Sequence, residues 1–268
     1  MSGAAPVLAL AAGGTGGHMF PAQALAEEAR ARGWSVLLLT DARGMRFADG
    51  FPADEIVELR AANPNVRGPA AKIGMAWAMA GGTRQAGRSL RAARPFATVG
   101  FGGYPSAPAM FAAKAARLRH GIHEQNAVLG RVNRRVAPSA DFVAHGFARL
   151  DRLGRVRGEV VQTGNPVRRA VRDAARPMGA IGDQANILVF GGSQGASLFS
   201  RVFPAALARL PTRLLRHSVM LLYARPRWRI VSCVKGVVAS RLSRSQCEPL
   251  YARSLASYTH GSVCRGCE

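Results

Sequence analysis

Three glycine-rich segments combine glycine with hydroxyl, imidazole or amide side chains, a composition suited to phosphate binding. They are Gly13-Gly14-Thr15-Gly16-Gly17-His18, Gly100-Phe101-Gly102-Gly103-Tyr104 and Gly191-Gly192-Ser193-Gln194-Gly195-Ala196. Each follows a short apolar run and precedes a stretch with helical spacing. Glycine lets the backbone approach an anion, and the N–H groups of the next helix's first turn face it. Three such turns predict a cleft for phosphorylated ligands.

The first turn ends in His18, which could hold a phosphate as a cation or accept a proton as a neutral base. A histidine that only caps a helix is the alternative. The turn is neither the Gly-x-Gly-x-x-Gly dinucleotide fingerprint nor a P-loop, because the spacing differs and no Lys-Ser/Thr follows. Asp41 lies near the position of the fingerprint's acidic residue, but the glycine pattern that would give it that role is absent.

Two further segments carry polar groups. Tyr104 ends the second turn, and the alternative there is an ordinary turn with the phenol on the surface. His123-Glu124-Gln125-Asn126 follows the apolar stretch Leu118–Ile122, so a strand ending there would direct this cluster into the same crevice. A solvated loop is the alternative for these four residues.

The elements that would position these groups alternate as in an α/β protein. Apolar runs predict strands at Pro6–Ala12, Trp34–Thr40, Ile56–Leu59, Thr98–Phe101 and Phe142–His145, and spacing predicts a helix over Pro21–Arg32. Near-continuous apolar strands indicate a parallel sheet covered on both faces. The pattern restarts at Ile187–Phe190, with a helix expected from Ser197 to Leu210.

We therefore expect four regions: a Rossmann-like domain over 1–160, a linker over 161–186, the start of a second Rossmann-like domain over 187–211, and a tail over 212–268. The tail contains ten Lys or Arg residues, two acidic residues and all four cysteines, without strand–turn–helix alternation. Cys264 and Cys267 could form half of a zinc site, but Cys233 and Cys247 form no second pair, and we expect no metal. Out-of-frame translation of a GC-rich gene is the more economical interpretation, and we expect the tail to be unstructured.

The net charge of +22 favours nucleic acid, anionic lipid or a polyanionic substrate. The arginines are scattered, few aromatic residues lie among them, and no nucleic-acid module is recognisable, so we expect no nucleic-acid partner. Coding bias toward arginine is an alternative source of the charge. No uninterrupted apolar run approaches a membrane span and the first residues lack the basic start of a signal peptide, which predicts a protein retained in the cytoplasm.

The glycine turns, His123-Glu124-Gln125-Asn126-Ala127 and Gly164-Asn165-Pro166-Val167-Arg168 occur in one order, and with them the chain resembles the MurG family over residues 1–211. The resemblance implies the two-domain GT-B fold, with most of the second domain missing or replaced here. It also implies transfer of N-acetylglucosamine from UDP-N-acetylglucosamine to undecaprenyl-linked lipid I, forming lipid II for peptidoglycan, with roles in cell shape and division and no cofactor. Alternatives are another GT-B glycosyltransferase or a non-catalytic basic fragment.

The resemblance also assigns residues by motif. Donor contacts would come from Thr15, Gly16, Gly17, Asn126, Arg168 and Ser193. The acceptor diphosphate would lie at Gly14, His18, Gly102, Gly103 and Tyr104. An inverting transfer needs a base near the acceptor hydroxyl, for which we nominate His18 first and Glu124 second.

A lipid-linked acceptor requires contact with the inner face of the bacterial plasma membrane. The apolar residues Ile73, Met75, Trp77 and Met79 lie near Arg84 and Arg88, which is the composition of a surface that docks on anionic lipid. A core-facing helix edge is the alternative. Because the segments expected to grip the nucleotide sugar are replaced by the tail, we expect this chain not to complete the transfer by itself.

Overall fold

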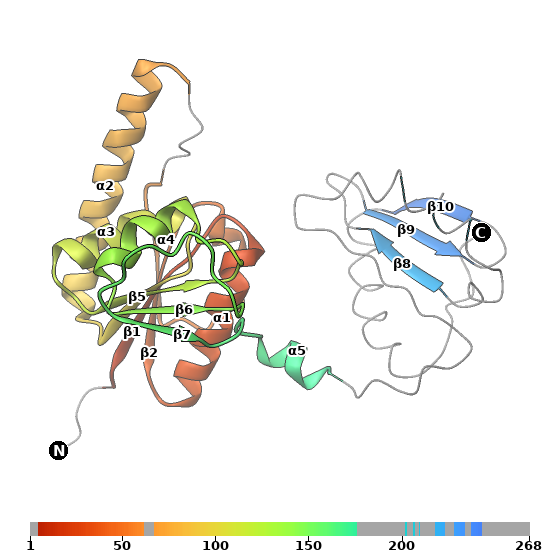
Figure 1. The fold of residues 1–268 in the computed structure, drawn as a ribbon, viewed down its shortest axis with the longest axis horizontal. Coiled ribbons are helices and arrows are strands. Elements are labelled where there is room, and N and C mark those ends of the chain that lie inside the picture. The colour runs from red at the N-terminus through yellow and green to blue at the C-terminus, as the bar shows by residue number, and fades with distance from the viewer. Residues whose placement is uncertain are drawn as a thin grey trace. The chain divides into compact units, whose positions relative to one another are not determined.

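The computed structural model describes residues 5–61 and 67–175, three strands between 218 and 242, and the single residues Val202, Ala206 and Arg209. The chain divides into two compact units, Met1–Arg172 and Asp173–Glu268. Figure 1 shows both units and labels most of their helices and strands.

The first unit is built on a seven-stranded sheet in which every adjacent pair is parallel. Its order is β3-β2-β1-β4-β5-β6-β7, the arrangement of a Rossmann fold. The strands are β1 (Val7–Ala11), β2 (Ser35–Thr40), β3 (Glu55–Glu58), β4 (Ala97–Gly100), β5 (His120–Glu124), β6 (Phe142–His145) and β7 (Glu159–Gln162). The order reverses between β1 and β4, and ligands of open α/β sheets bind beyond the strand ends at such a point.

Helices cover both faces of this sheet. They are α1 (Gly16–Ala31), α2 (Pro69–Ala93), α3 (Ala107–Ala115) and α4 (Arg131–Val136), with short 3-10 turns η1 (Gly44–Phe47), η2 (Tyr104–Ser106) and η3 (Ala137–Ser139). The short helix α5 (Arg169–Asp173) follows β7 and has no buried residue. Leu8 and Leu10 of β1 pack with α1 residues in one apolar cluster, whereas Ala9 and Ala11 pack with residues of α2, α3 and α4 in another. The alternation of a strand's side chains thus gives β1 two buried faces, as its continuous apolar sequence predicts.

The strands predicted between residues 6 and 145 are confirmed to within a few residues, but two boundaries differ in ways that matter for the site. Helix α1 begins at Gly16 rather than at Pro21, so the glycine turn runs directly into the helix and Pro21 lies inside it. Proline favours the first turn of a helix, which is why the sequence pointed to a later start. Strand β5 extends through Glu124, so His123 and Glu124 are buried strand residues and not part of a solvated loop.

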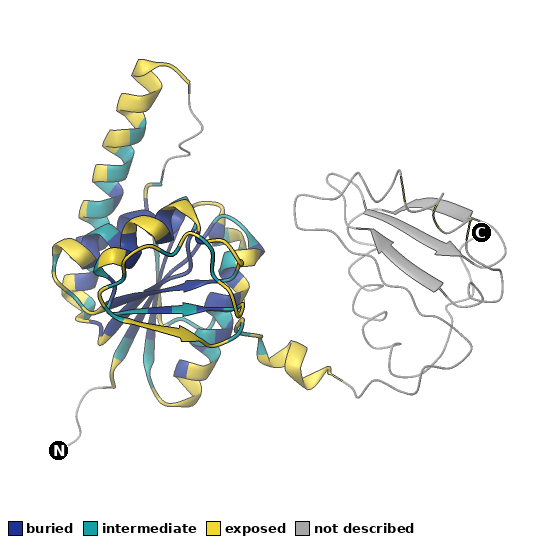
Figure 2. Cartoon of the chain, in the orientation of Figure 1, coloured by how far each residue is buried: buried dark blue, intermediate teal, exposed yellow. Residues whose placement is uncertain are grey.

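The long helix α2 is packed along only part of its length. Its buried residues are Gly82, Ala86, Gly87 and Leu90, all in the C-terminal half. Figure 2 shows the opposite end of α2 largely exposed as it extends away from the sheet. Trp77 is 75% exposed and Ile73 is 59% exposed on this end. Among the described residues, no helix is both long and apolar enough to cross a bilayer.

The second unit contains three described strands, β8 (Ser218–Leu222), β9 (Trp228–Cys233) and β10 (Val237–Leu242), paired antiparallel in the order β10-β9-β8. This differs from the expectation that residues 212–268 form no regular structure. The strand predicted at Ile187–Phe190, the third glycine turn with Ser193 and the Cys264–Cys267 pair lie outside the described residues. Strand β7 crosses the domain boundary expected at residue 160, and the four-region division otherwise stays a prediction.

The uneven packing of α2 predicts different effects of truncation at its two ends. Leu90→Ala should lower the free energy of unfolding by about 2–5 kcal/mol, because Leu90 is fully buried against the sheet. Trp77→Ala, at the exposed end, should change it by less than about 0.5 kcal/mol. Urea unfolding followed by circular dichroism compares the two variants, and equal losses would contradict this description of α2.

Candidate anion-binding site at the switch point of the sheet

The first two glycine turns meet where the strand order reverses. They follow β1 and β4, which are adjacent in the sheet. A methyl group added at Gly13 would lie 2.6 Å from the Pro105 side chain, and one added at Gly103 would lie 3.3 Å from Cε1 of His18. A side chain at Gly13 would therefore force the two turns apart. The structure thus brings these two turns into contact, while their role in ligand binding stays a prediction.

Asp41 holds the first turn in its conformation. Its buried carboxylate accepts hydrogen bonds from the backbone N–H groups of Gly14 (3.0 Å) and Gly44 (2.9 Å), and it pairs with Arg43 at 3.1 Å. Gly14 has a φ of +81°, a region that side chains other than glycine rarely adopt. Asp41 thus anchors the turn's backbone from the end of β2. Its position just after an apolar strand was visible in the sequence, but without the fingerprint spacing it suggested no role.

The turn leaves the N-terminus of α1 facing the crevice. Thr15 caps the helix through its carbonyl, which accepts the N–H groups of His18 and Met19 at 3.1 Å. The N–H groups of Gly16 and Gly17 have no acceptor in the part of the chain that the structure describes. Such unpaired donors, together with the helix dipole, favour an anion.

His18 lies between the two turns. Its Nδ1 is 3.4 Å from the Thr15 hydroxyl, and its ring packs beside Gly103. Burial lowers the pKa of His18 below 6.5, although the negative charge of Glu124 acts in the opposite direction. The imidazole is therefore neutral at pH 7 and has the protonation state required to accept a proton.

Glu124, the second nominated base, is fully occupied by hydrogen bonds. It is 2% exposed. Oε1 accepts from the backbone and side-chain N–H groups of Asn126 at 3.1 and 2.9 Å, and Oε2 accepts from Gly130 N–H and Asn133 Nδ2 at 2.9 Å each. A carboxylate has about four acceptor positions, all used here. This geometry fits a residue that shapes the loop after β5, and it favours His18 over Glu124 as the base.

His123 forms a hydrogen bond with the segment that carries Arg168. Its Nε2 lies 3.0 Å from the Gly164 carbonyl and its Nδ1 lies 3.1 Å from Gln125 Nε2. These partners are satisfied by one neutral tautomer, with the proton on Nε2. Burial lowers the pKa of His123, opposed by its bond to the Gly164 carbonyl and by Glu124. Asn165 Nδ2 also donates to the Gln125 carbonyl at 3.2 Å, so the segment is held on the end of β5.

A pocket of about 560 Å³ lies between the N-terminal end of α1, the loop after β5 and the segment that carries Arg168. The predicted donor residues Thr15, Gly16, Gly17, Asn126 and Arg168 all line it, together with His18. The remaining lining residues are Phe20, Pro21, Gln125, Asn165, Pro166, Val167 and Val171. Of the predicted acceptor residues, Gly103 contacts His18, and Tyr104 packs on the core with its hydroxyl 3.3 Å from Arg131 Nη1. The described residues contain no cluster of three metal-ligating side chains.

The predicted membrane-docking residues divide between two sides of α2. Ile73 and Trp77 are four residues apart and exposed, and helical spacing places Arg84 and Arg88 on the same side. Met79 is partly buried and packs against the core, and Met75 is half-buried. Because 100° separates successive residues of a helix, the two methionines cannot share the face of Ile73 and Trp77. The residues that share one exposed face are therefore Ile73, Trp77, Arg84 and Arg88, and membrane docking through them stays a prediction.

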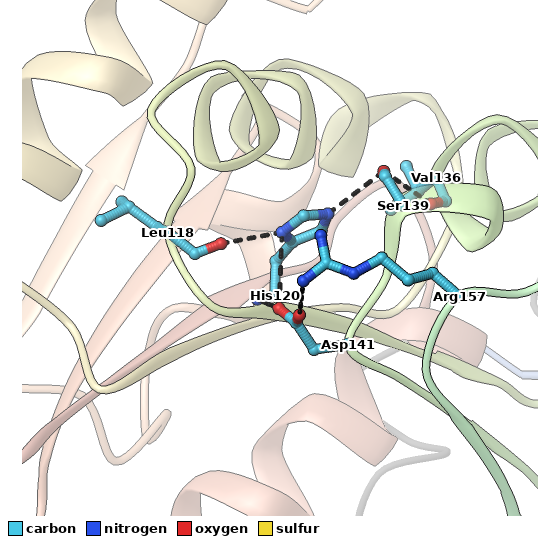
Figure 3. A network of polar contacts seen from close by, with 6 residues as sticks. All are labelled: Leu118, His120, Val136, Ser139, Asp141 and Arg157. Atoms are coloured by element: carbon cyan, nitrogen blue, oxygen red, sulfur yellow. Dashed lines mark hydrogen bonds and ion pairs between the residues drawn. The ribbon is translucent and has the colours of Figure 1, made fainter.

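A second histidine network lies at the opposite end of β5 (Figure 3). His120 Nδ1 is 2.8 Å from the Leu118 carbonyl and Nε2 is 3.3 Å from the Ser139 hydroxyl, while its backbone N–H donates to Asp141. Arg157 pairs with Asp141 at 3.4 Å. Ser139 Oγ itself donates to the Val136 carbonyl. The network joins the segments before β5, β6 and β7 and is far along the strand from the pocket.

The N-terminal half of a GT-B glycosyltransferase is a Rossmann-like domain, and the sheet described above, with its pocket at the switch point, has this architecture. The profile of the glycosyltransferase family 28 N-terminal domain matches residues 8–145. The chain belongs to glycosyltransferase family 28. The α/β GT-B fold class expected for it is thereby confirmed, with the structure describing the first domain.

Similar proteins agree with this membership. The UDP-N-acetylglucosamine--N-acetylmuramyl-(pentapeptide) pyrophosphoryl-undecaprenol N-acetylglucosamine transferase of Maricaulis maris is 44% identical over 246 residues, 90% of this chain and 66% of that protein. The protein of the same name from Sinorhizobium medicae is 45% identical over 87% of this chain and 62% of its own length. The chain therefore spans less than two thirds of the curated relatives it matches.

Two solved structures share the fold. Acinetobacter baumannii MurG has a TM-score of 0.56 at 28% identity, covering 77% of this chain and 58% of that protein. The glycotransferase of kitacinnamycin has a TM-score of 0.58 at 16% identity, covering 84% of this chain and 67% of the other, a likeness in fold alone.

The lowered pKa values of His18 and His123 predict how stability depends on pH. Below pH 6.5 the unfolded chain binds protons at these side chains that the folded chain does not, so the free energy of unfolding should fall as the pH drops from 7 toward about 5. His123→Gln, which keeps a donor for Gly164 but does not titrate, should reduce this slope. Urea unfolding at a series of pH values measures it, and an unchanged slope in a His18→Gln/His123→Gln variant would contradict the assignment.

Proposed function

We propose that this chain provides the acceptor-facing half of an inverting transferase that moves N-acetylglucosamine from UDP-N-acetylglucosamine to undecaprenyl-linked lipid I, forming lipid II. The convergence of two glycine turns on His18 carries the proposal, because it places anion-binding backbone beside a neutral imidazole. The names of relatives at 44–45% identity support the choice of donor and acceptor.

Each group then has a chemical task. The acceptor hydroxyl attacks the anomeric carbon of the sugar, His18 takes the hydroxyl proton, and the bond from that carbon to the UDP oxygen breaks with its electron pair leaving on UDP. Gly16 and Gly17 N–H groups and Arg168 stabilise the negative charge of diphosphates, and Asn126 and Thr15 orient the donor. Gly14, Gly102, Gly103 and Tyr104 shape the acceptor side, with Ser193 expected on the donor side. Lipid II formation links the proposal to cell-wall synthesis, cell shape and cell division.

We also propose that the protein works as a peripheral enzyme on the cytoplasmic face of the inner membrane. Ile73 and Trp77 on the projecting end of α2 would enter the headgroup region, and Arg84 and Arg88 would meet anionic phosphates. We propose no nucleic-acid partner. On α2 the arginines Arg84 and Arg88 lie on the same side as the exposed apolar residues Ile73 and Trp77, a combination suited to a lipid surface.

Incubation with UDP-N-acetylglucosamine and a lipid I analogue tests the proposed reaction. Binding of both substrates without turnover would support the proposed donor and acceptor sites. It would also support the expectation, drawn from the tail, that the 268-residue chain does not complete the transfer. Lipid II formation that falls at least about 100-fold in His18→Gln would support the reaction and overturn that expectation. Failure to bind either substrate would contradict the proposed function, and His18→Gln that still binds UDP serves as the control for an intact pocket.

Co-sedimentation with vesicles of anionic phospholipid tests the docking surface. Ile73→Ser/Trp77→Ser should weaken vesicle binding about tenfold or more, because two exposed apolar side chains lose their burial in the interface. Phe96→Ser is the matched control, since Phe96 is also an exposed aromatic (52%) beside an arginine but lies just before β4 and outside α2. Equal weakening by both variants would contradict docking through α2.

A further inference from the structure

Phe20 is an aromatic side chain left partly exposed in the pocket. It lies in the second turn of α1, is 39% exposed and lines the pocket. Its ring packs edge-on against Phe47, with centroids 5.6 Å apart and planes at 89°. A methyl group at Gly16 would come within 2.7 Å of the ring, so the ring lies tightly against the first turn of the helix. An exposed ring in this position needs an explanation other than core packing.

The guanidinium of Arg168 lies over the ring of Phe20. The Arg168 Cζ atom lies 4.0 Å from the centroid of Phe20, within the range of a cation–π interaction. Arg168 has no carboxylate partner in the described part of the chain. A further contact holds this segment on α1 one residue along, where Arg169 N–H donates to Glu27 Oε2 at 2.7 Å. Phe20 and Glu27 are seven residues apart and therefore lie on one face of the helix.

We propose that Phe20 is a positioning residue that presents Arg168 to a nucleoside diphosphate. An aromatic face attracts the cation but offers no hydrogen-bond acceptor, so the guanidinium N–H groups remain available for phosphate oxygens. An aspartate or glutamate in its place would hold Arg168 as well but would compete with the phosphate for the same donors. The ring thus fixes the arginine beside the N-terminus of α1 before the ligand arrives, which reduces the ordering that binding requires.

This inference rests on the proposed function, because it assumes that the pocket binds the diphosphate of the donor. UDP is the probe, and isothermal titration gives its affinity for the wild-type chain and for Phe20→Leu, Phe20→Tyr and Arg168→Ala. Phe20→Leu keeps an apolar contact with Phe47 but removes the π face, and it should weaken binding about fivefold. Phe20→Tyr should stay within about twofold of the wild type. In the Arg168→Ala background, Phe20→Leu should add almost nothing.

A spectroscopic signal reports the contact itself. The Nε–Hε resonance of Arg168 should be shifted by the ring current in the wild type and in Phe20→Tyr, and should return to the range of solvated arginines in Phe20→Leu. Phe96→Leu is the matched control, because it removes a similar pair with Arg119 at 5.0 Å away from the pocket and should leave UDP binding unchanged.

The outcomes separate the two proposals. UDP binding that is equal in the wild type and Phe20→Leu would overturn the positioning role while leaving the proposed function in place. Equal weakening by Phe20→Leu with and without Arg168 would also overturn it, since the effect would not pass through the arginine. A wild-type chain that does not bind UDP would overturn the donor site and this inference together.

Discussion

The four hydrogen bonds of the Glu124 carboxylate are the interaction on which the rest of the site depends. A buried carboxylate is costly unless its oxygens are paired, and here two backbone N–H groups and two side-chain amides supply the partners. These bonds fix the loop from Asn126 to Gly130 at the end of β5 and attach α4 through Asn133. The same charge opposes the effect of burial on both His18 and His123. One side chain thereby links the loop that lines the pocket to the two imidazoles beside it.

A second buried carboxylate, that of Asp41, holds another part of the site in place. Asp41 pairs with two backbone N–H groups that include the one of Gly14, and so holds the glycine turn open at the N-terminus of α1. Neither carboxylate lines the pocket. The pocket is instead lined by apolar side chains such as Phe20 and Val167, by neutral polar groups, by the N-terminus of α1 and by Arg168, and the last two favour an anion. The carboxylates of Glu124 and Asp41 support the backbone around the pocket without lining it, whereas the helix N–H groups and Arg168 line it. This arrangement is the physical basis of the proposed diphosphate binding.

Much of the first domain could be predicted from the chain because strong local signals agree there. The apolar runs of β1 and β2, with a glycine turn between them, define a βαβ unit, and the ordered motifs indicate the family. The roles of individual polar residues were harder, because they depend on contacts across the sheet. Nothing in the sequence around Glu124 distinguishes a base from a structural carboxylate until Gly130 and Asn133 are placed against it. The partnership of Phe20 and Arg168 spans 148 positions and has no local signal at all.

In helix α2, too, the sequence alone did not decide which side chains are exposed. From Ile73 to Met79 large apolar residues alternate with glycine and alanine without a clear helical pattern, because the buried residues of the helix all lie from Gly82 onward. The positions of Met75 and Met79 were therefore misjudged, although helical geometry decides them once the element is known.

A crystal structure of the chain with UDP would test the central claim most directly, since the claim concerns where a diphosphate binds. The account predicts phosphate oxygens within hydrogen-bond distance of the Gly16 and Gly17 N–H groups and of the Arg168 guanidinium. A diphosphate bound elsewhere, for example in the arginine-lined groove of Arg84, Arg88 and Arg91 between α2 and α3, would contradict it.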